Sequence, residues 1–246
     1  MTCSLSAQAQ NRVKNIYTET KTLSVEQVMN SEQTVQLNRY FMAGYNTLCL
    51  PMSLDATQLA EAAKDLRVER MVAIRQEGST LSMYFTDCTQ EGIEAGVPYL
   101  VFSPTAQYMR VKNTSATILN DDLQTIRMSD EQGNQVAFSS SWNLRTKEGL
   151  YGIPAKQNTA VLESILISTT ADQSFLPTRC GFCWEQQSAT ATALEIKHVS
   201  AAEATAITTV KSDKKQAAGA YDLNGRRLTS GTKKGIYIQD GKKVVY

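Results

Sequence analysis

The chain has little of what enzymes usually need. Its 246 residues include one histidine, His198, so any Ser–His–acid or Cys–His site would have to use it. His198 falls in a strand-like segment near the end of the chain, and no nucleophile elbow occurs anywhere in the sequence. No glycine-rich phosphate-binding loop is present. We therefore expect a protein that is not an enzyme and that uses no cofactor.

Long apolar runs are also missing. None approaches the ~18–20 residues that a helix needs to cross a bilayer, so we expect no transmembrane segment. Hydrophobic residues make up 42% of the chain and charged residues 20%, which is typical of a folded globular protein and excludes a disordered one. With 25 basic and 24 acidic residues, the chain has almost no net charge.

The charge is unevenly spread, because residues 211–246 hold nine basic residues and three acidic ones. A basic end can bind nucleic acid or an anionic surface. We interpret this one as a solvated Lys-rich end that keeps edge strands soluble, and we expect no nucleic-acid partner.

Cysteine is scarce, with five residues: Cys3, Cys49, Cys88, Cys180 and Cys183. Their pairing stays open, since the last four permit up to two disulfides. Cys180 and Cys183 form a single C-x-x-C motif, whereas a zinc site normally needs two further ligands. Residues three apart in a strand also point to opposite faces, so we expect core or edge cysteines and no metal site.

Short apolar segments separated by turn residues dominate residues 34–200. Alternation at 34–40 is typical of a half-buried strand, and Glu77-Gly78 predicts a hairpin between 71–76 and 80–85. The sequence clearly predicts only one helix, from a capping box at Asp55 and Gln58 and an apolar stripe over roughly three turns. We predict a mainly β fold, a β-sandwich or open barrel of antiparallel strands with one short helix.

Composition divides the chain further. Residues 1–33 are a polar N-terminal segment, 34–200 the β-sandwich-like part, 201–219 a linker, and 220–246 a small C-terminal β-hairpin module. The module is predicted from Asn224-Gly225 and Asp240-Gly241, the dipeptides that type I′ hairpin turns favour. Two hairpins bury little apolar area, so we expect this tail to dock on the main domain or on another partner.

Aromatic residues give the candidate ligand contacts. Trp142, Tyr151 and Trp184 could form a platform on which a sugar ring stacks, although β domains also bury tryptophans in their cores. Carboxylates are plentiful but no pair stands out, so a secreted hydrolase with an unrecognised carboxylate site remains an alternative.

Four stretches resemble a class of secreted and surface proteins of Bacteroidetes. Residues 45–52 (YNTLCLPM) resemble the W-N-T-L-C-L-P-F strand of that class, and 93–101 (IEAGVPYLV) its I-x-A-G-x-P-Y-L-I segment. Residues 175–182 (FLPTRCGF) are similar to F-L-P-x-R-A-Y-F, and 235–245 (GIYIQDGKKVV) to G-I-Y-I-x-x-G-K-K-V tails that are themselves similar to type IX sorting domains.

The resemblance implies export, a β-sandwich-like body and a C-terminal β module, but no reaction. It agrees with the Ala7-Gln8-Ala9 triplet, which is typical of a signal-peptidase site and would make residues 1–9 the remnant of a signal peptide. We expect an extracytoplasmic protein, secreted, periplasmic or on the cell surface, that binds or adheres to a glycan or a surface protein. Alternatively, it is a structural component of a surface assembly whose tail docks on export or surface machinery.

Overall fold

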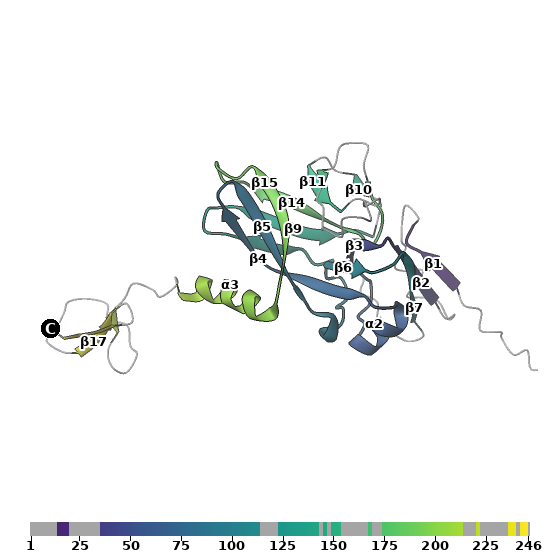
Figure 1. Ribbon diagram of the computed structural model, residues 1–246, viewed down its shortest axis with the longest axis horizontal. Helices are drawn as coiled ribbons and strands as arrows, with labels where there is room; N and C mark the ends of the chain where they lie inside the picture. The colour runs from purple at the N-terminus through teal and green to yellow at the C-terminus, as the bar shows by residue number, and fades with distance from the viewer. Residues whose placement is uncertain are drawn as a thin grey trace, which may run out of the picture. The chain divides into compact units, whose positions relative to one another are not determined.

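The computed structural model describes residues 14–19, 35–113, 123–142, 145–146, 149–153, 167–168, 174–213, 220–221, 236–239 and 242–245. The chain divides into two compact units, Met1–Ala201 and Ala202–Tyr246, which are described separately. Within the described residues, strands far outnumber helices (Figure 1), and the predicted mainly β fold is confirmed.

A three-stranded sheet lies at the start of the first unit. It consists of β1 (Lys14–Tyr17), β2 (Val35–Phe41) and β7 (Gln107–Asn113), in the order β1-β2-β7. β1 runs parallel to β2, and β2 runs antiparallel to β7. β1 falls in the segment that composition described only as polar, because a four-residue strand with a distant partner leaves no periodic pattern.

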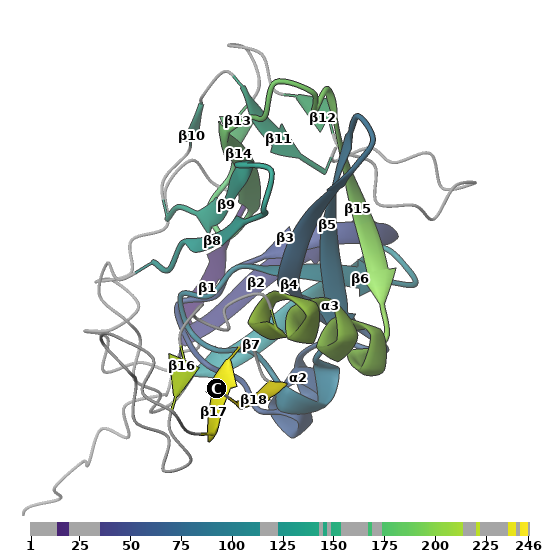
Figure 2. The same ribbon diagram turned by 90° about the vertical axis from the view of Figure 1, so that its left-hand side faces the viewer.

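The second sheet has five strands in the order β15-β5-β4-β6-β3. Their bounds are β3 (Gly44–Leu48), β4 (Arg67–Glu77), β5 (Thr80–Asp87), β6 (Tyr99–Ser103) and β15 (Ala193–Val199). β4 and β5 form the hairpin predicted at Glu77-Gly78, and Gly78 has the positive φ of 61° that such a turn requires. β15 runs parallel to β5 at the edge of the sheet (Figure 2), an exception to the antiparallel pattern.

The third sheet also has five strands, in the order β12-β11-β14-β9-β8. Their bounds are β8 (Ile126–Ser129), β9 (Gln135–Ser140), β11 (Leu150–Gly152), β12 (Ile167–Ser168) and β14 (Cys180–Gln186). A further short pair joins β10 (Arg145–Thr146) to β13 (Ser174–Phe175). All pairings in these two groups are antiparallel.

Three phenylalanines join the two five-stranded sheets. The rings of Phe138 on β9 and Phe182 on β14 stack with centroids 4.3 Å apart, and Phe85 on β5 meets both edge-on at 5.9 and 6.1 Å. All three side chains are fully buried. Burying one such side chain stabilises the fold by about 1.5–3 kcal/mol, so this aromatic contact is a main source of sheet-to-sheet cohesion.

The predicted helix is α2 (Ala56–Ala62), and a 3-10 turn, η1 (Thr89–Glu91), follows β5. The predicted capping box of α2 is present. Gln58 N donates to Asp55 Oδ1 at 2.8 Å, and Asp55 N donates to Gln58 Oε1 at 3.0 Å. Leu54 and Leu59 are both buried in the core, as the hydrophobic staple predicts. The helix has seven residues, shorter than the predicted three turns, because the backbone becomes extended at Ala63.

The second unit contains α3 (Ala201–Asp213), which begins at the boundary residue, and the strands β16 (Ala220–Tyr221), β17 (Ile236–Gln239) and β18 (Lys242–Val245). Residues 201–213 are thus helical, in the segment that composition predicted as a linker. β17 and β18 pair antiparallel with Gln239 opposite Lys242, as the Asp240-Gly241 prediction requires. The hairpin predicted at Asn224-Gly225 lies outside the described residues.

Candidate functional site

The three aromatic residues singled out in the sequence lie against the core. Trp142 is 6% exposed, while Tyr151 on β11 and Trp184 on β14 are partly buried and pack on core side chains. Tyr151 lies opposite the fully buried Phe182 of β14, and Trp184 lies two residues beyond Phe182 on β14. The structure thus brings Tyr151 and Trp184 onto adjacent strands and gives all three a packing role. Their ligand contacts stay a prediction.

The exposed aromatic surface lies elsewhere, on the three-stranded sheet. Among the described residues, the most exposed large hydrophobic side chains are those of Tyr17 and Tyr108, which are 48% and 39% exposed. The Tyr108 ring meets Tyr17 edge-on, with centroids 6.2 Å apart, and Tyr40 at a tilt, with centroids 5.0 Å apart. Three tyrosines from three strands therefore form one contiguous cluster.

Strand alternation explains why these rings face outward. On β7, Met109 and Val111 are buried, so their neighbours Tyr108, Arg110 and Lys112 lie on the opposite, exposed side. On β2, Leu37 and Phe41 point into the core, and the register places Tyr40 directly opposite Tyr108. We call this outward surface the tyrosine face; it comprises Asn15, Tyr17, Gln36, Asn38, Tyr40, Tyr108, Arg110 and Lys112.

Amide side chains run beside the rings. Gln36 Nε2 donates to Asn38 Oδ1 at 2.9 Å, and Asn38 Nδ2 donates to Gln36 O at 3.2 Å and to Asn15 Oδ1 at 3.4 Å. Asn38 is almost fully buried and holds the row in place, while the amides of Asn15 and Gln36 have donor hydrogens and an acceptor oxygen that can reach a polar ligand. The tyrosine face thus combines ring surface with fixed donors and acceptors.

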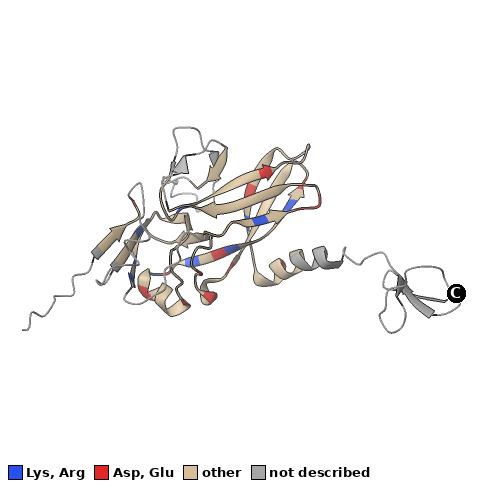
Figure 3. Cartoon of the chain, turned by 180° about the vertical axis from the view of Figure 1, so that it is seen from behind, with Lys and Arg blue, Asp and Glu red and all other residues tan. Residues whose placement is uncertain are grey.

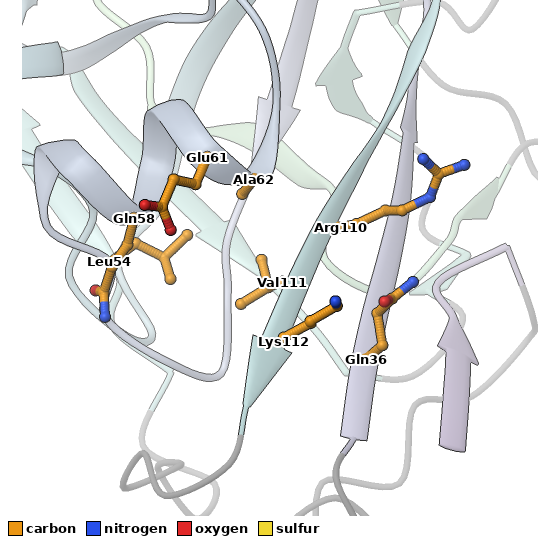
Figure 4. A pocket seen from close by; sticks show the side chains of 8 residues that line it. All are labelled: Gln36, Leu54, Gln58, Glu61, Ala62, Arg110, Val111 and Lys112. Atoms are coloured by element: carbon orange, nitrogen blue, oxygen red, sulfur yellow. The ribbon is translucent and has the colours of Figure 1, made fainter. Parts of the chain in front are cut away.

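A pocket of about 480 Å³ adjoins the tyrosine face where β7 passes α2. It is lined by Gln36, Leu54, Gln58, Glu61, Ala62, Arg110, Val111 and Lys112 (Figure 4). The apolar members form its floor between helix and strand, Gln58 and Glu61 come from α2, and the remaining polar side chains come from β2 and β7. The pocket therefore shares Gln36, Arg110 and Lys112 with the tyrosine face.

Strand β1, which carries Tyr17, is anchored to the rest of the fold by contacts of Thr18 and Glu19, the two residues that follow it. Thr18 N donates to Asn38 O at 3.0 Å, and Glu19 Oε2 accepts from Arg179 Nη2 at 2.6 Å. Glu19 also lies 3.7 Å from Arg39, whose guanidinium is almost fully buried. Burial, and then the charge of Arg179, lower the pKa of Arg39 to about 9. Glu19 thus partly offsets two neighbouring cations and holds the end of β1 in place.

His198, the single histidine, belongs to a different cluster. Its Nδ1 lies 2.6 Å from Glu69 Oε2, and its ring stacks on Tyr45 with centroids 4.4 Å apart. Arg67 Nε donates to Glu69 Oε1 at 2.8 Å and Arg67 Nη2 to the Tyr45 hydroxyl at 2.5 Å. Burial, and then the charge of Glu69, raise the pKa of Tyr45. These contacts satisfy a buried carboxylate, which is a structural requirement in itself.

The cysteines that the structure describes are all free thiols. Cys180 is buried on the core side of β14, and Cys183, partly exposed, lies on the other side, as expected for residues three apart in a strand. Burial raises the pKa of the Cys49 thiol well above its ordinary value and that of Cys88 to about 12. These two thiols are therefore protonated and unreactive at neutral pH.

The first three stretches that carry the resemblance meet in space around β3. Cys49 N donates to Thr178 O at 2.9 Å, Gly96 N donates to Leu50 O at 2.8 Å, and Cys180 N donates to Thr47 Oγ1 at 2.8 Å. Gly96 has a φ of 76°, a conformation that favours glycine. Within the described residues these stretches are remote in sequence but joined by hydrogen bonds, two of them between backbone groups, and they form part of the framework of the fold.

Sequence reasoning missed the tyrosine face. Alternation in 34–40 and 108–111 could have placed Tyr40 and Tyr108 on the polar side of their strands, whereas Tyr17 joins them only through the parallel pairing of β1 with β2.

No helix in the described part of the chain has both the length and the apolarity needed to cross a membrane. Comparisons with protein-family models, curated proteins and solved structures found no match for this chain.

Proposed function

We propose that the protein is an exported, non-enzymatic module that binds carbohydrate through the tyrosine face. One observation carries the proposal. The two exposed large hydrophobic side chains of the described residues, Tyr17 and Tyr108, touch each other, and Tyr40 extends the same cluster. Exposed aromatic rings that serve no packing need are what a sugar-binding surface presents, because the apolar faces of sugar rings stack on them.

The polar surroundings favour a carbohydrate over a protein partner. A protein-binding hot spot is rich in Trp, Tyr and Arg and lies at the well-packed centre of an interface, where it becomes fully desolvated. Here the rings are flanked by the amides of Asn15 and Gln36 and by two cations, and the described residues include no other exposed large hydrophobic side chain. Rings beside fixed donors and acceptors suit a ligand that has an apolar face and many hydroxyl groups.

A catalytic role finds less support. A glycoside hydrolase typically places two carboxyl groups on either side of the scissile bond. The lining of the pocket beside the tyrosine face includes one acid, Glu61 of α2, and the Arg110 and Lys112 side chains extend from β7 on the side away from that helix (Figure 4). Release of reducing ends from a bound polysaccharide, abolished in Glu61→Gln, would contradict the non-enzymatic proposal.

An extracytoplasmic location is supported by the Ala7-Gln8-Ala9 triplet and by the resemblance to secreted and surface proteins. Fractionation of the native producing cell, followed by mass spectrometry of the N-terminus, tests this part of the proposal. A chain that begins at Gln10 outside the cytoplasm supports export. A chain that keeps Met1 in the cytoplasm contradicts it.

The binding proposal is tested with the full chain in affinity gel electrophoresis through a panel of soluble plant and bacterial polysaccharides. We expect at least one polysaccharide to retard the protein, and Tyr17→Ala combined with Tyr108→Ala to abolish the retardation. Trp184→Ala is the discriminating variant, because it removes one of the aromatic residues singled out in the sequence. Retardation lost in folded Trp184→Ala but kept in the double variant would move the site to β14 and overturn the proposal.

A further inference from the structure

The charge pattern of the tyrosine face narrows the class of ligand. Arg110 and Lys112 alternate with the buried Met109 and Val111 on β7, so they stand on the same side of the sheet as Tyr108. The Arg110 guanidinium carbon lies 5.8 Å from the centroid of the Tyr108 ring. A cation at that distance interacts with the ring and is held beside it.

Among the arginines with described side chains, Arg110 differs in having no acidic partner within the described residues. The other arginines with described side chains all have a carboxylate nearby: Arg39 and Arg179 share Glu19, and Arg67, Arg70, Arg75 and Arg127 pair with Glu69, Glu91, Glu77 and Glu185. Two of these pairs, Arg67–Glu69 and Arg75–Glu77, join residues two apart on β4, and Figure 3 shows charged residues of both signs along single strands. Arg110 and its neighbour Lys112 have no ion pair among the residues described.

We infer that the ligand is an acidic polysaccharide, one whose sugar rings carry carboxylate groups; this rests on the proposed carbohydrate-binding function. The planar guanidinium of Arg110 matches the two oxygens of a carboxylate, while the adjacent Tyr108 and Tyr17 take the apolar face of the ring. Lys112, which lines the same pocket as Arg110, adds a second positive charge for the next sugar along a chain. Glu61 on the far side of the pocket disfavours the carboxylate there and directs it to the β7 side.

A matched pair of ligands tests the inference. Polygalacturonate and its fully methyl-esterified form have the same rings, but only the first is charged. We expect the full chain to bind polygalacturonate at least tenfold more tightly than the ester, and Arg110→Gln to reduce binding to polygalacturonate roughly tenfold, the effect of one charge-assisted hydrogen bond, with no change for the ester. Arg75→Gln, an exposed arginine on β4, is the control and should bind as the unaltered chain does.

The outcomes separate this inference from the proposed function. If Tyr108→Ala weakens binding but the two ligands bind alike and Arg110→Gln has no effect, the face binds neutral sugars and the inference is overturned alone. If Tyr108→Ala leaves binding to every polysaccharide unchanged, the proposed function itself falls. Dextran sulfate and single-stranded DNA are polyanions that test whether the surface binds any negatively charged polymer. If both bind as tightly as polygalacturonate, irrespective of Tyr108, the surface attracts any polyanion and the inference is wrong.

Discussion

The carboxylate of Glu69 is buried and lies 2.6 Å from Nδ1 of His198, which ties the edge strand β15 to β4 across the sheet. The same carboxylate accepts from Arg67, and the imidazole stacks on Tyr45. Histidine therefore serves here as a hydrogen-bonding and stacking group in a structural cluster.

This cluster predicts an order of stabilities. His198→Phe keeps a ring over Tyr45 but loses the hydrogen bond to Glu69, and should cost about 1–3 kcal/mol of unfolding free energy. His198→Ala loses the stacking as well and should cost more. Glu69→Gln should destabilise the protein by a similar 1–3 kcal/mol. Urea unfolding followed by tryptophan fluorescence measures all three; variants as stable as the unaltered chain would rule out this structural role.

Arg39 predicts how stability changes in alkali. Its guanidinium is buried and its pKa is lowered to about 9, by burial and then by Arg179. The folded state thus loses this proton near pH 9, whereas the unfolded chain keeps it to higher pH. The unfolded state binds more protons above that point, so this group's unfavourable contribution at neutral pH is progressively relieved as the pH rises.

Arg39→Met should remove that pH dependence. At pH 7 we expect the variant to be as stable as the unaltered chain or more so, because a buried charge no longer has to be desolvated. The difference in unfolding free energy between the two chains, measured in urea at pH 7 and pH 10, should shift in favour of the unaltered chain at the higher pH. A difference that does not change with pH would contradict the account of Arg39.

The cysteines should react at very different rates. Cys183 is partly exposed, whereas Cys49, Cys88 and Cys180 are buried, and burial raises the pKa of Cys88 to about 12. At pH 8 we expect iodoacetamide to label Cys183 more than tenfold faster than these three, since the thiolate is the reactive form. Peptide mass spectrometry reads each site, and urea should abolish the difference. Equal labelling of Cys88 in the folded protein would contradict this.

The capping box of α2 predicts a modest cost for Asp55→Ala. The substitution removes the acceptor for Gln58 N, so the first turn of the helix loses a cap that typically contributes about 1 kcal/mol. Thermal unfolding should show a lower midpoint. Asp55→Asn, which keeps an acceptor oxygen, is the control and should restore most of the loss.

Local patterns predicted much of this fold. The hairpin at Glu77-Gly78, the helix start at Asp55 and the antiparallel pair on either side of Asp240-Gly241 all depend on residues close together in the chain. The parallel pairings of β1 with β2 and of β15 with β5 do not, because no turn links such strands. The Ala-, Thr-, Lys- and Ser-rich composition of residues 201–219 predicts a linker, and residues 201–213 of that segment form the helix α3.

The site was harder to predict for a related reason. Aromatic type alone singled out Trp142 and Trp184, and the structure packs both on the core. What distinguishes Tyr17 and Tyr108 is exposure and mutual contact, which depend on strand pairing across 91 residues of chain. That Arg110 has no ion pair among the described residues likewise becomes visible only when the partners of the other arginines are known.

The most direct test of the account is the affinity of the full chain for the polysaccharide that it binds best, compared between Tyr108→Ala and Tyr108→Phe. Isothermal titration calorimetry should show roughly tenfold weaker binding for Tyr108→Ala, the effect of about 1.4 kcal/mol, because the stacking ring is gone. Tyr108→Phe keeps the ring and should bind nearly as the unaltered chain does. Equal affinity of all three folded proteins would contradict the claim that the tyrosine face is the binding site.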